Sequence, residues 1–534
     1  MQTVTNTNDT HHGRSTAARP APVSRAVATL VALGSVVAGK AMIALGVRRA
    51  PEGWRRTVGI LLRSESTRFA LSAFGLRVPG VAPAGVATDD AVEPRIAAAL
   101  LAFLATEPDA LFWLESRKHV TVRRPLRHVD VAVLRFGGDG TLQGLDPHLA
   151  SAGPAAPEPA AQARVHAAVI AAYNMTARLP EVRRPGALVE QVRQRLGPTG
   201  EEVDTYATRI LSACCLSFEG VASDADARFC PPDFVSRRSL GLGYLSCVAR
   251  ADGQRGLVDL WVSAHHVGLD GVPLQDLLSR LEGAWGVEPV TFPAARSGAA
   301  FGPHACHAPG ERAVDHLVTF VDLSPVLELR RDLTAQHAGA IGGEVTLGTL
   351  LAWLLSQEPE FAGVRIASTV DVKPSGGYDR DVDVVPLRPA DFATGSGPWG
   401  GFIGFAREFN RLIAASRTRT SPLRIGMQTA GLLPPWAHAT SVRSNPAALD
   451  DTFGSLCVTI IRDARVFVAP MTDLGLGHGF IAIGSATLPS ADGRRVSSVS
   501  IKGDAGRVAH YPEILQRVIA RAAAERGRPG FKAR

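Results

Sequence analysis

Cysteine is scarce in this chain of 534 residues, and no two cysteines have the Cys-x-x-Cys spacing of metal or redox sites. The cysteines are Cys214, Cys215, Cys230, Cys247, Cys306 and Cys457. They offer no disulfide framework, so we interpret them as free or buried thiols in a reducing compartment. The tightest group of metal-ligand types, at 304–307, lies among glycine and proline, where adjacent side chains rarely converge on one ion. We therefore expect no metal ion.

Aromatic residues and net charge are also low. Aromatic residues make up 6% of the chain, and the 57 Lys and Arg exceed the 50 Asp and Glu by only 7. A nucleic-acid-binding surface combines a dense basic stripe with stacking aromatics, so we expect no nucleic-acid partner. The small basic excess suits a phosphate-bearing ligand or an anionic membrane surface. Because 46% of the residues are hydrophobic, the composition excludes disorder of the whole chain.

A long apolar run lies near the N-terminus, after a polar segment, residues 1–25, that predicts a disordered tail. Residues 26–47 read AVATLVALGSVVAGKAMIALGV and contain one charge, Lys40. We expect a hydrophobic helix over 26–50, and three arrangements remain open: a helix that spans a membrane, a helix that lies in its interface, and a helix buried in the body. Arginines are more numerous after the run than before it, which predicts a cytoplasmic location at the cytoplasmic face of the membrane.

Several segments of the second half repeat segments of the first. The run LLAFLATEPD at 100–109 resembles LLAWLLSQEPE at 350–360, and both end in Glu-Pro. Downstream, VDVAV at 129–133 resembles VDVVP at 382–386. This order predicts that one structural unit occurs twice.

The ends of the two halves also match. SLGLGYL (239–245) resembles GFIAIGS (479–485), Asp252-Gly253 recurs as Asp492-Gly493, and 262–281 aligns without gaps on 499–518. Each member of the last pair predicts a strand that leads into a helix. We expect a duplicated α/β lobe with a cleft between its copies. The expected division is 51–286 for lobe 1, 287–312 for a linker, 313–525 for lobe 2 and 526–534 for a basic tail.

The chemistry-bearing residues of lobe 1 lie between the expected strand and helix, where the chain reads His265-His266-Val267-Gly268-Leu269-Asp270-Gly271. The alignment places Gly503 opposite His266 and Arg507 opposite Asp270 in lobe 2. A histidine in such a turn can take a proton near neutral pH, and Asp270 can order the loop. The alternative is a pair of hydrogen-bonded core histidines.

The pattern HHxxxDG resembles the active-site motif of the coenzyme A-dependent acyltransferase superfamily. That superfamily includes chloramphenicol acetyltransferase, dihydrolipoamide acyltransferase cores of 2-oxo acid dehydrogenase complexes, condensation domains and wax ester synthases. In lobe 2, LVTFVDLSPVLELRRD (317–332), GEVTLGTLLAWLLSQEPEF (343–361) and FGSLCVTIIRD (453–463) are similar to the catalytic domain of the dihydrolipoamide enzymes.

The resemblance implies an α/β fold of two tandem chloramphenicol acetyltransferase-like lobes, each a mixed sheet flanked by helices, with the active site in a channel between them. It implies a His266 general base and an oxyanion donor at Thr459, although Thr459 also fits as an ordinary β-branched strand residue. Acyl-coenzyme A or an acyl carrier protein would be the co-substrate, with no permanently bound cofactor. Lys502 and Arg507 are candidates for binding the nucleotide phosphates.

The expected activity is acyl transfer from a thioester to a hydroxyl or amine of a small-molecule or lipid acceptor, by a monomer or small homo-oligomer. Two alternatives remain open. One is a non-catalytic, membrane-associated scaffold of the same fold, and the other is a condensation-type enzyme that acts on carrier-bound substrates. The sequence does not identify the acyl chain or the acceptor, because fold-level kinship does not determine substrates.

Overall fold

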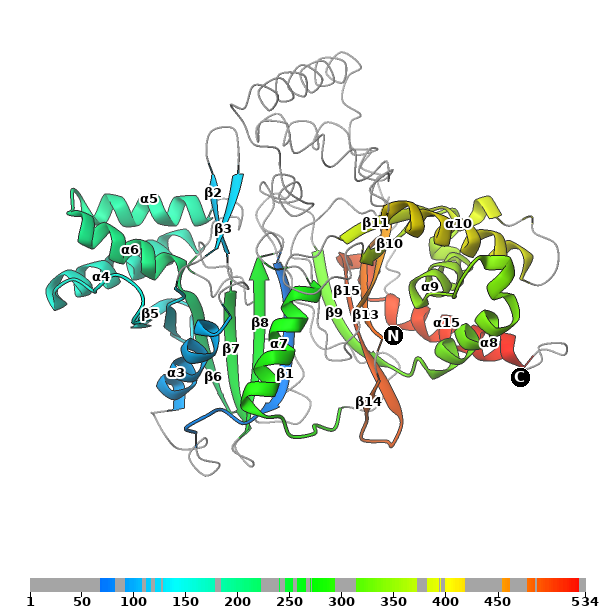
Figure 1. Cartoon of the computed structure of the whole chain (residues 1–534), viewed down its shortest axis with the longest axis horizontal. Coiled ribbons are helices and arrows are strands. Elements are labelled where there is room, and N and C mark those ends of the chain that lie inside the picture. The colour runs from blue at the N-terminus through cyan, green and yellow to red at the C-terminus, as the bar shows by residue number, and fades with distance from the viewer. Residues whose placement is uncertain are drawn as a thin grey trace, which may run out of the picture.

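A computed structural model describes most of the chain between residues 68 and 527 (Figure 1). The described residues are 68–81, 92–107, 112–116, 121–125, 128–177, 184–221, 240, 245–252, 257–265, 269, 271–292, 314–371, 382–392, 394, 399–417, 454–461, 478–485 and 487–527. The predicted tail and apolar helix at 1–50, most of the linker, and residues 528–534 of the basic tail lie outside them. Within the described ranges, no helix combines the length and apolarity needed to cross a bilayer.

The first sheet is mixed, and its strands run in the order β1-β8-β7-β6-β4-β5. The central pairs β7–β6 and β6–β4 are parallel, and the outer pairs β1–β8, β8–β7 and β4–β5 are antiparallel. Its strands are β1 (Arg68–Leu76), β4 (Val131–Phe136), β5 (Leu142–His148), β6 (Cys214–Val221), β7 (Leu245–Asp252) and β8 (Leu257–His265). A separate hairpin joins β2 (Phe112–Ser116) to β3 (Thr121–Pro125).

Helices cover both faces of this sheet because successive strand residues point to opposite faces. On β4, Val131 and Val133 belong to the apolar cluster of α3 (Val92–Ala105) and α7 (Gly271–Trp285). Ala132 and Leu134 belong to the cluster of the helices on the other face. Those helices are α4 (Pro159–Thr176), α5 (Arg184–Leu196) and α6 (Glu201–Ser212).

The second sheet has the order β9-β15-β13-β12-β10-β11, with the short β14 (Leu488–Pro489) added to β15. Its central pairs β13–β12 and β12–β10 are parallel, and its outer pairs are antiparallel. The strands are β9 (Val314–Val321), β10 (Ile366–Asp371), β11 (Val382–Leu387), β12 (Leu456–Ile461), β13 (Gly479–Gly484) and β15 (Arg495–Asp504).

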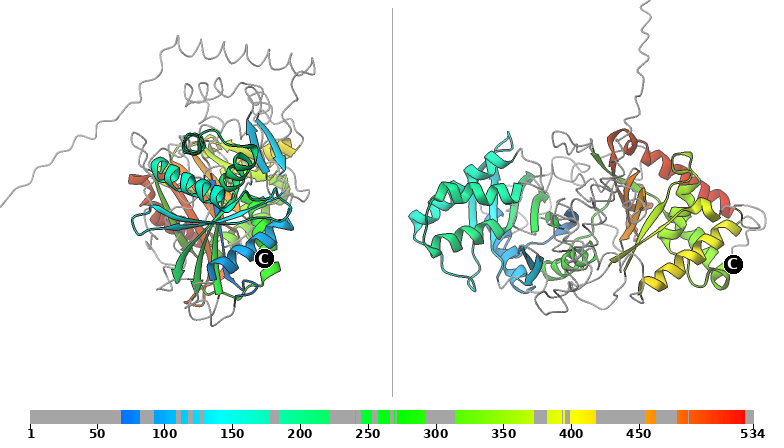
Figure 2. Two further views of the ribbon diagram at one scale, coloured as in Figure 1. Left: turned by 90° about the vertical axis from the view of Figure 1, so that its left-hand side faces the viewer. Right: turned by 90° about the horizontal axis from the view of Figure 1, so that it is seen from above.

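The helices of the second lobe pack on the face of its sheet that points away from lobe 1, where they form one apolar cluster. They lie at the opposite end of the molecule from α4–α6 (Figure 2). They are α8 (Ser324–Ile341), α9 (Leu347–Ser356), α10 (Gly400–Arg417), α14 (Ala505–Val508) and α15 (Tyr511–Arg526), with the 3₁₀ turns η4 (Pro359–Phe361) and η5 (Pro389–Phe392). Local signals set their ends: Thr346 caps the start of α9, and Gly342 ends α8 in the left-handed conformation.

The two sheets share one strand order and one pattern of parallel and antiparallel pairs. The expectation of an α/β fold with two mixed sheets flanked by helices is confirmed. The aligned segments 262–281 and 499–518 occupy the same place in each sheet, since β8 and β15 both lead into a helix. In lobe 2 that helix is interrupted, because α14 ends at Val508 and α15 begins at Tyr511.

Two of the repeat assignments are wrong. VDVAV lies at the start of β4, the fifth strand of its sheet, whereas VDVVP lies in the sixth, edge strand β11; the partner of β4 is β10. SLGLGYL ends where β7 begins, whereas GFIAIGS forms β13 itself. Short alternating apolar runs fit any half-buried strand, so five to seven such residues do not distinguish neighbouring strands.

A buried glutamate ties the same two helices together in each lobe. Glu107 follows α3 and lies 3.5 Å from Arg280 of α7. Glu358 follows α9 and lies 2.7 Å from Arg517 and 3.0 Å from Arg521 of α15. The gap-free alignment places Arg517 opposite Arg280, so the repeated Glu-Pro and the repeated helix meet in both lobes.

The first residues of the expected linker bridge the lobes. Val287 forms a β-bridge with Leu76, and Phe292 forms one with Ser490 of lobe 2. The Phe292 ring packs edge-on against Phe74, with the ring centres 5.7 Å apart, and also contacts Phe320. This part of 287–312 is therefore packed into the junction of the lobes.

Candidate functional site

The histidine motif stands between two described elements. β8 ends at His265, Leu269 is buried with 1% of its surface exposed, and α7 begins at Gly271. This is the strand and helix context that the motif predicts. His266 and Asp270 themselves lie outside the described residues, so their roles stay predictions.

Leu269 belongs to an apolar cluster that extends across both lobes. The cluster contains Leu274 and Leu277 of α7, spaced so that both lie on one helix face. It also contains residues of sheet 2, namely Ala367, Val384, Cys457, Ile461, Phe480 and Ala482. Figure 1 shows α7 in front of β8 and β1, the strands of sheet 1 that lie nearest to sheet 2. Leu269 of the motif and the inward face of sheet 2 therefore share one packed interior.

Thr459 lies on that inward face. Residues two positions apart on a strand point to the same face, so Thr459 shares its face of β12 with Cys457 and Ile461, which belong to the shared cluster. Only 8% of the surface of Thr459 is exposed. Gly454, just before β12, has a φ of +71°, and a Cβ there would stand 2.7 Å from the carbonyl oxygen of Arg365. A glycine thus permits the close approach that brings β12 alongside β10.

The Thr459 hydroxyl has a partner that the sequence did not reveal. Its Oγ1 is hydrogen-bonded to Oγ1 of Thr369 on the neighbouring strand β10. Thr369 shares the inward face with Ala367, two residues earlier, and its cross-strand neighbour Val384 belongs to the shared cluster. The only sequence signal was a threonine within an apolar strand, which propensity alone explains.

Cys457 lies two residues before Thr459 on β12, but its thiol is unsuited to act as a nucleophile. Its side chain is buried, and burial raises the pKa of the thiol to about 12. The thiol therefore stays protonated near neutral pH, where a thiolate would be needed to attack a thioester.

The two phosphate-binding candidates differ in exposure. Lys502 is 6% exposed and pairs in register with Phe480 on one side and His316 on the other. Arg507 of α14 is exposed. A single exposed basic patch does not include both side chains, and their phosphate-binding role stays a prediction.

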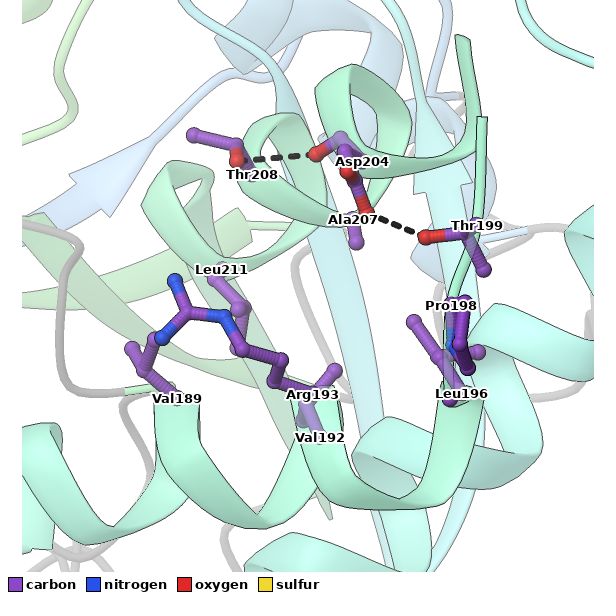
Figure 3. A pocket seen from close by; sticks show the side chains of 11 residues that line it. Val189, Val192, Arg193, Leu196, Pro198, Thr199, Asp204, Ala207, Thr208 and Leu211 are labelled. Atoms are coloured by element: carbon purple, nitrogen blue, oxygen red, sulfur yellow. Dashed lines mark hydrogen bonds between the residues drawn. The ribbon is translucent and has the colours of Figure 1, made fainter. Parts of the chain in front are cut away.

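A pocket of about 510 Å³ lies elsewhere, between α5 and α6 on the outer side of lobe 1 (Figure 3). Val192, Leu196 and Leu211 line it, and Arg193 extends along it. At its rim, Asp204 accepts a hydrogen bond from Thr199, and the Asp204 carbonyl accepts one from Thr208 at 2.9 Å. None of the predicted site residues contributes to this pocket.

No three metal-ligand side chains gather to hold an ion among the residues that the structure describes. The histidines and the cysteine of 304–307 lie outside these residues.

No protein-family model and no curated protein matches the sequence. Among solved structures, the dihydrolipoamide acetyltransferase of Azotobacter vinelandii is 17% identical, with 40% of this chain and 83% of that chain covered and a TM-score of 0.26. TRI101 of F. graminearum, complexed with coenzyme A and deoxynivalenol, is 12% identical over 88% of this chain and 97% of that chain, with a TM-score of 0.42. The wax ester synthase/diacylglycerol acyltransferase of Marinobacter aquaeolei VT8 is 12% identical over 90% and 100%, with a TM-score of 0.34. The first and third of these structures are named as acyltransferases, and the second holds coenzyme A.

Proposed function

We propose that this chain is an acyltransferase that moves an acyl group from a thioester to a hydroxyl or amine acceptor. The observation that carries the proposal is the apolar cluster that joins Leu269, inside the histidine motif, to Cys457 and Ile461, which flank Thr459. It supports one site formed by the end of β8 in lobe 1 and by β12 in lobe 2. The thioester is acyl-coenzyme A or an acyl carrier protein.

In the proposed reaction, His266 takes the proton of the acceptor while the acceptor lone pair attacks the carbonyl carbon of the thioester. The carbonyl π electrons move to oxygen, and the Thr459 hydroxyl donates a hydrogen bond to this oxyanion. When the intermediate collapses, the C–S bond breaks and the sulfur leaves with the proton returned by the imidazolium. Asp270 orders the loop, and His265 and Gly271 mark its two ends.

Transfer is proposed to be direct, without an acyl-enzyme. Cys457 is the thiol beside Thr459, and its raised pKa keeps it in the poorly nucleophilic protonated form. Direct transfer requires donor and acceptor to be held together, which a site between two lobes can do from opposite sides.

Arg507 is proposed to attract the phosphates of a coenzyme A donor, because it is exposed and follows the strand aligned with β8. Lys502 is kept as a second candidate, although it is buried. The expected signature in Arg507→Ala is a higher KM for acyl-coenzyme A with an unchanged kcat. An unchanged KM would remove Arg507 from the site.

A lipid donor or acceptor at the cytoplasmic face of a membrane is proposed from the apolar run at 26–47, which has the length of a membrane helix. The full chain should float with anionic phospholipid vesicles in a density gradient. A chain that stays at the bottom in both anionic and neutral vesicles would favour the buried-helix arrangement.

The two lobes are proposed to be copies of one ancestral α/β unit. Their common strand order and the repeated glutamate–arginine pairs support this. If they are copies, removing either carboxylate should weaken the same helix junction in each lobe.

The test of the function is thiol release by the purified full chain from acyl-coenzyme A donors of increasing length, with hydroxyl and amine acceptors supplied. Turnover that depends on an acceptor and disappears in His266→Ala supports the proposal. If no coenzyme A donor is turned over, the same acyl groups on a carrier protein separate the condensation-type reaction from a scaffold. Inactivity with both donors, in a folded protein, would favour the scaffold.

A further inference from the structure

We infer that Thr369 is a positioning residue for the oxyanion donor: its hydroxyl holds the Thr459 hydroxyl in the orientation that acyl transfer needs. The inference rests on the proposed function. It starts from the hydrogen bond between the two Oγ1 atoms, which joins β10 to β12 across 90 positions of sequence.

The two hydroxyls have limited freedom. Both belong to β-branched side chains, whose χ1 angles are restricted, and both side chains lie on the same face of neighbouring strands. Thr459 is buried and Thr369 is half-buried, so neither is surrounded by bulk water. The direction of each hydroxyl is therefore set largely by the partner that it bonds to.

A hydroxyl has one proton to donate and can accept two hydrogen bonds. If Thr459 donates its proton to Thr369, it has none left for an oxyanion. If Thr369 donates to Thr459, the Thr459 proton is free to point at the developing charge. Accepting a hydrogen bond also makes a hydroxyl a better donor, because linked hydrogen bonds polarise one another. Only the arrangement with Thr369 as donor serves the reaction.

The first lobe provides an internal comparison. Ala132 pairs with Cys215 in lobe 1 as Ala367 pairs with Cys457 in lobe 2, which places Ser217 in the position of Thr459. The same register places Leu134 in the position of Thr369. Lobe 1 keeps a hydroxyl on the inner strand but has an apolar neighbour beside it. The hydroxyl pair is thus specific to the lobe whose inward face packs in one cluster with Leu269 of the motif.

The experiment measures kcat and KM for thiol release by the full chain and by Thr369→Val, Thr369→Ser, Thr459→Val and the double Val variant. Thr369→Val keeps the shape and removes the hydroxyl, whereas Thr369→Ser keeps the hydroxyl. The matched control is Thr319→Val. Thr319 is a buried threonine of β9. It lies on the same strand face as Leu317 and Val321, which is covered by the helices of lobe 2.

We expect Thr459→Val to lower kcat on the order of 10²-fold. Thr369→Val should lower kcat roughly tenfold with KM unchanged, as for other groups that orient a functional side chain through a hydrogen bond. Thr369→Ser should recover most of this loss, and Thr319→Val should leave kcat near the wild-type value. In the Thr459→Val background, Thr369→Val should cause no further loss, because there is no hydroxyl left to position.

A further tenfold loss in the double variant would overturn the inference, as would a Thr369→Val enzyme with the wild-type kcat beside an impaired Thr459→Val enzyme. Failure of the proposed function looks different: His266→Ala and Thr459→Val would then match the wild type. The urea midpoints of the same variants test the bond without turnover. Additive midpoint shifts would show that the two hydroxyls are not coupled and would also overturn the inference.

Discussion

The two lobes have the same strand order but differ at the ends of the equivalent strands β8 and β15. β8 ends at His265, before the segment that holds His266 and Asp270. β15 instead continues through Gly503 to Asp504, and Arg507 lies in α14. On β6 and β12, two strands away in each sheet, it is lobe 2 that carries the additional polar group. Lobe 2 has the hydroxyl pair Thr459 and Thr369, whereas lobe 1 has Ser217 beside Leu134.

What covers each sheet explains the second difference. Leu134 and Cys215 pack under α4–α6. Val248, the cross-strand neighbour of Ser217, packs in an apolar cluster with Phe74, Phe320 and Val496, so apolar side chains of both lobes fill the face around Ser217. Cys457 and Ile461 pack in the cluster that includes α7 of the other lobe. In the proposed site, lobe 1 supplies the base and lobe 2 supplies the oxyanion donor, so each lobe needs only one of the two groups.

The largest expected effect comes from the base. His266→Ala should lower turnover on the order of 10³-fold, because it removes the imidazole that is proposed to accept the acceptor proton. Thiol release under saturating acyl-coenzyme A measures it. The control is His337→Ala, which removes a half-buried histidine from α8 of lobe 2. If both histidine variants retain full activity, the two strand ends do not differ in function.

The next effect compares the two equivalent hydroxyls. Thr459→Val should lower kcat about 10²-fold, whereas Ser217→Ala should change kcat less than about threefold, since apolar side chains fill the sheet face around Ser217. Both changes remove a buried hydroxyl, so each should lower the unfolding free energy by about 1 kcal/mol. Equal losses of activity in kinetic assays would mean that both lobes contribute an oxyanion donor.

The glutamate–arginine pairs test whether the lobes are built alike. Glu358→Gln should lower the free energy of unfolding by about 2 kcal/mol, because it leaves two arginines without a buried carboxylate. Glu107→Gln should lower it by about 1 kcal/mol, because the ion pair of Glu107 with Arg280 is longer, at 3.5 Å, and Arg280 is 60% exposed. Urea unfolding at constant ionic strength measures both. A larger effect at Glu107 would contradict the ranking.

Local sequence was a good guide wherever a signal lies within one element and its turn. The alignment of 262–281 with 499–518 places β8 and β15 correctly, and the Asp492-Gly493 turn closes the hairpin of β14 and β15 with Gly493 at a φ of +77°. A turn glycine and a strand that leads into a helix are short-range features, so the sequence of a single segment is enough to predict them.

The sequence did not predict which strands pair when they lie far apart along the chain. The sequence matched β4 with β11 because both alternate, and only the hydrogen-bonded register identifies β10 as its partner. Thr369 went unnoticed for the same reason, since its meaning depends on Thr459 far along the chain. Register is fixed by tertiary packing of one face, which composition and period do not encode.

The smallest expected effect concerns the cysteines that occupy the same place in the two sheets, Cys215 and Cys457. Cys457→Ala should change turnover less than about twofold, as should Cys215→Ala, because neither thiol takes part in direct transfer. The pKa of Cys457 is raised to about 12, so its thiol stays neutral throughout the range from pH 7 to 10. Because the thiol stays protonated over this range, we expect no thiol-dependent inflection in the pH–rate profile. A step in that profile near pH 9 that vanishes in Cys457→Ala, together with an acyl adduct in the acid-quenched protein, would replace direct transfer by a covalent intermediate on lobe 2.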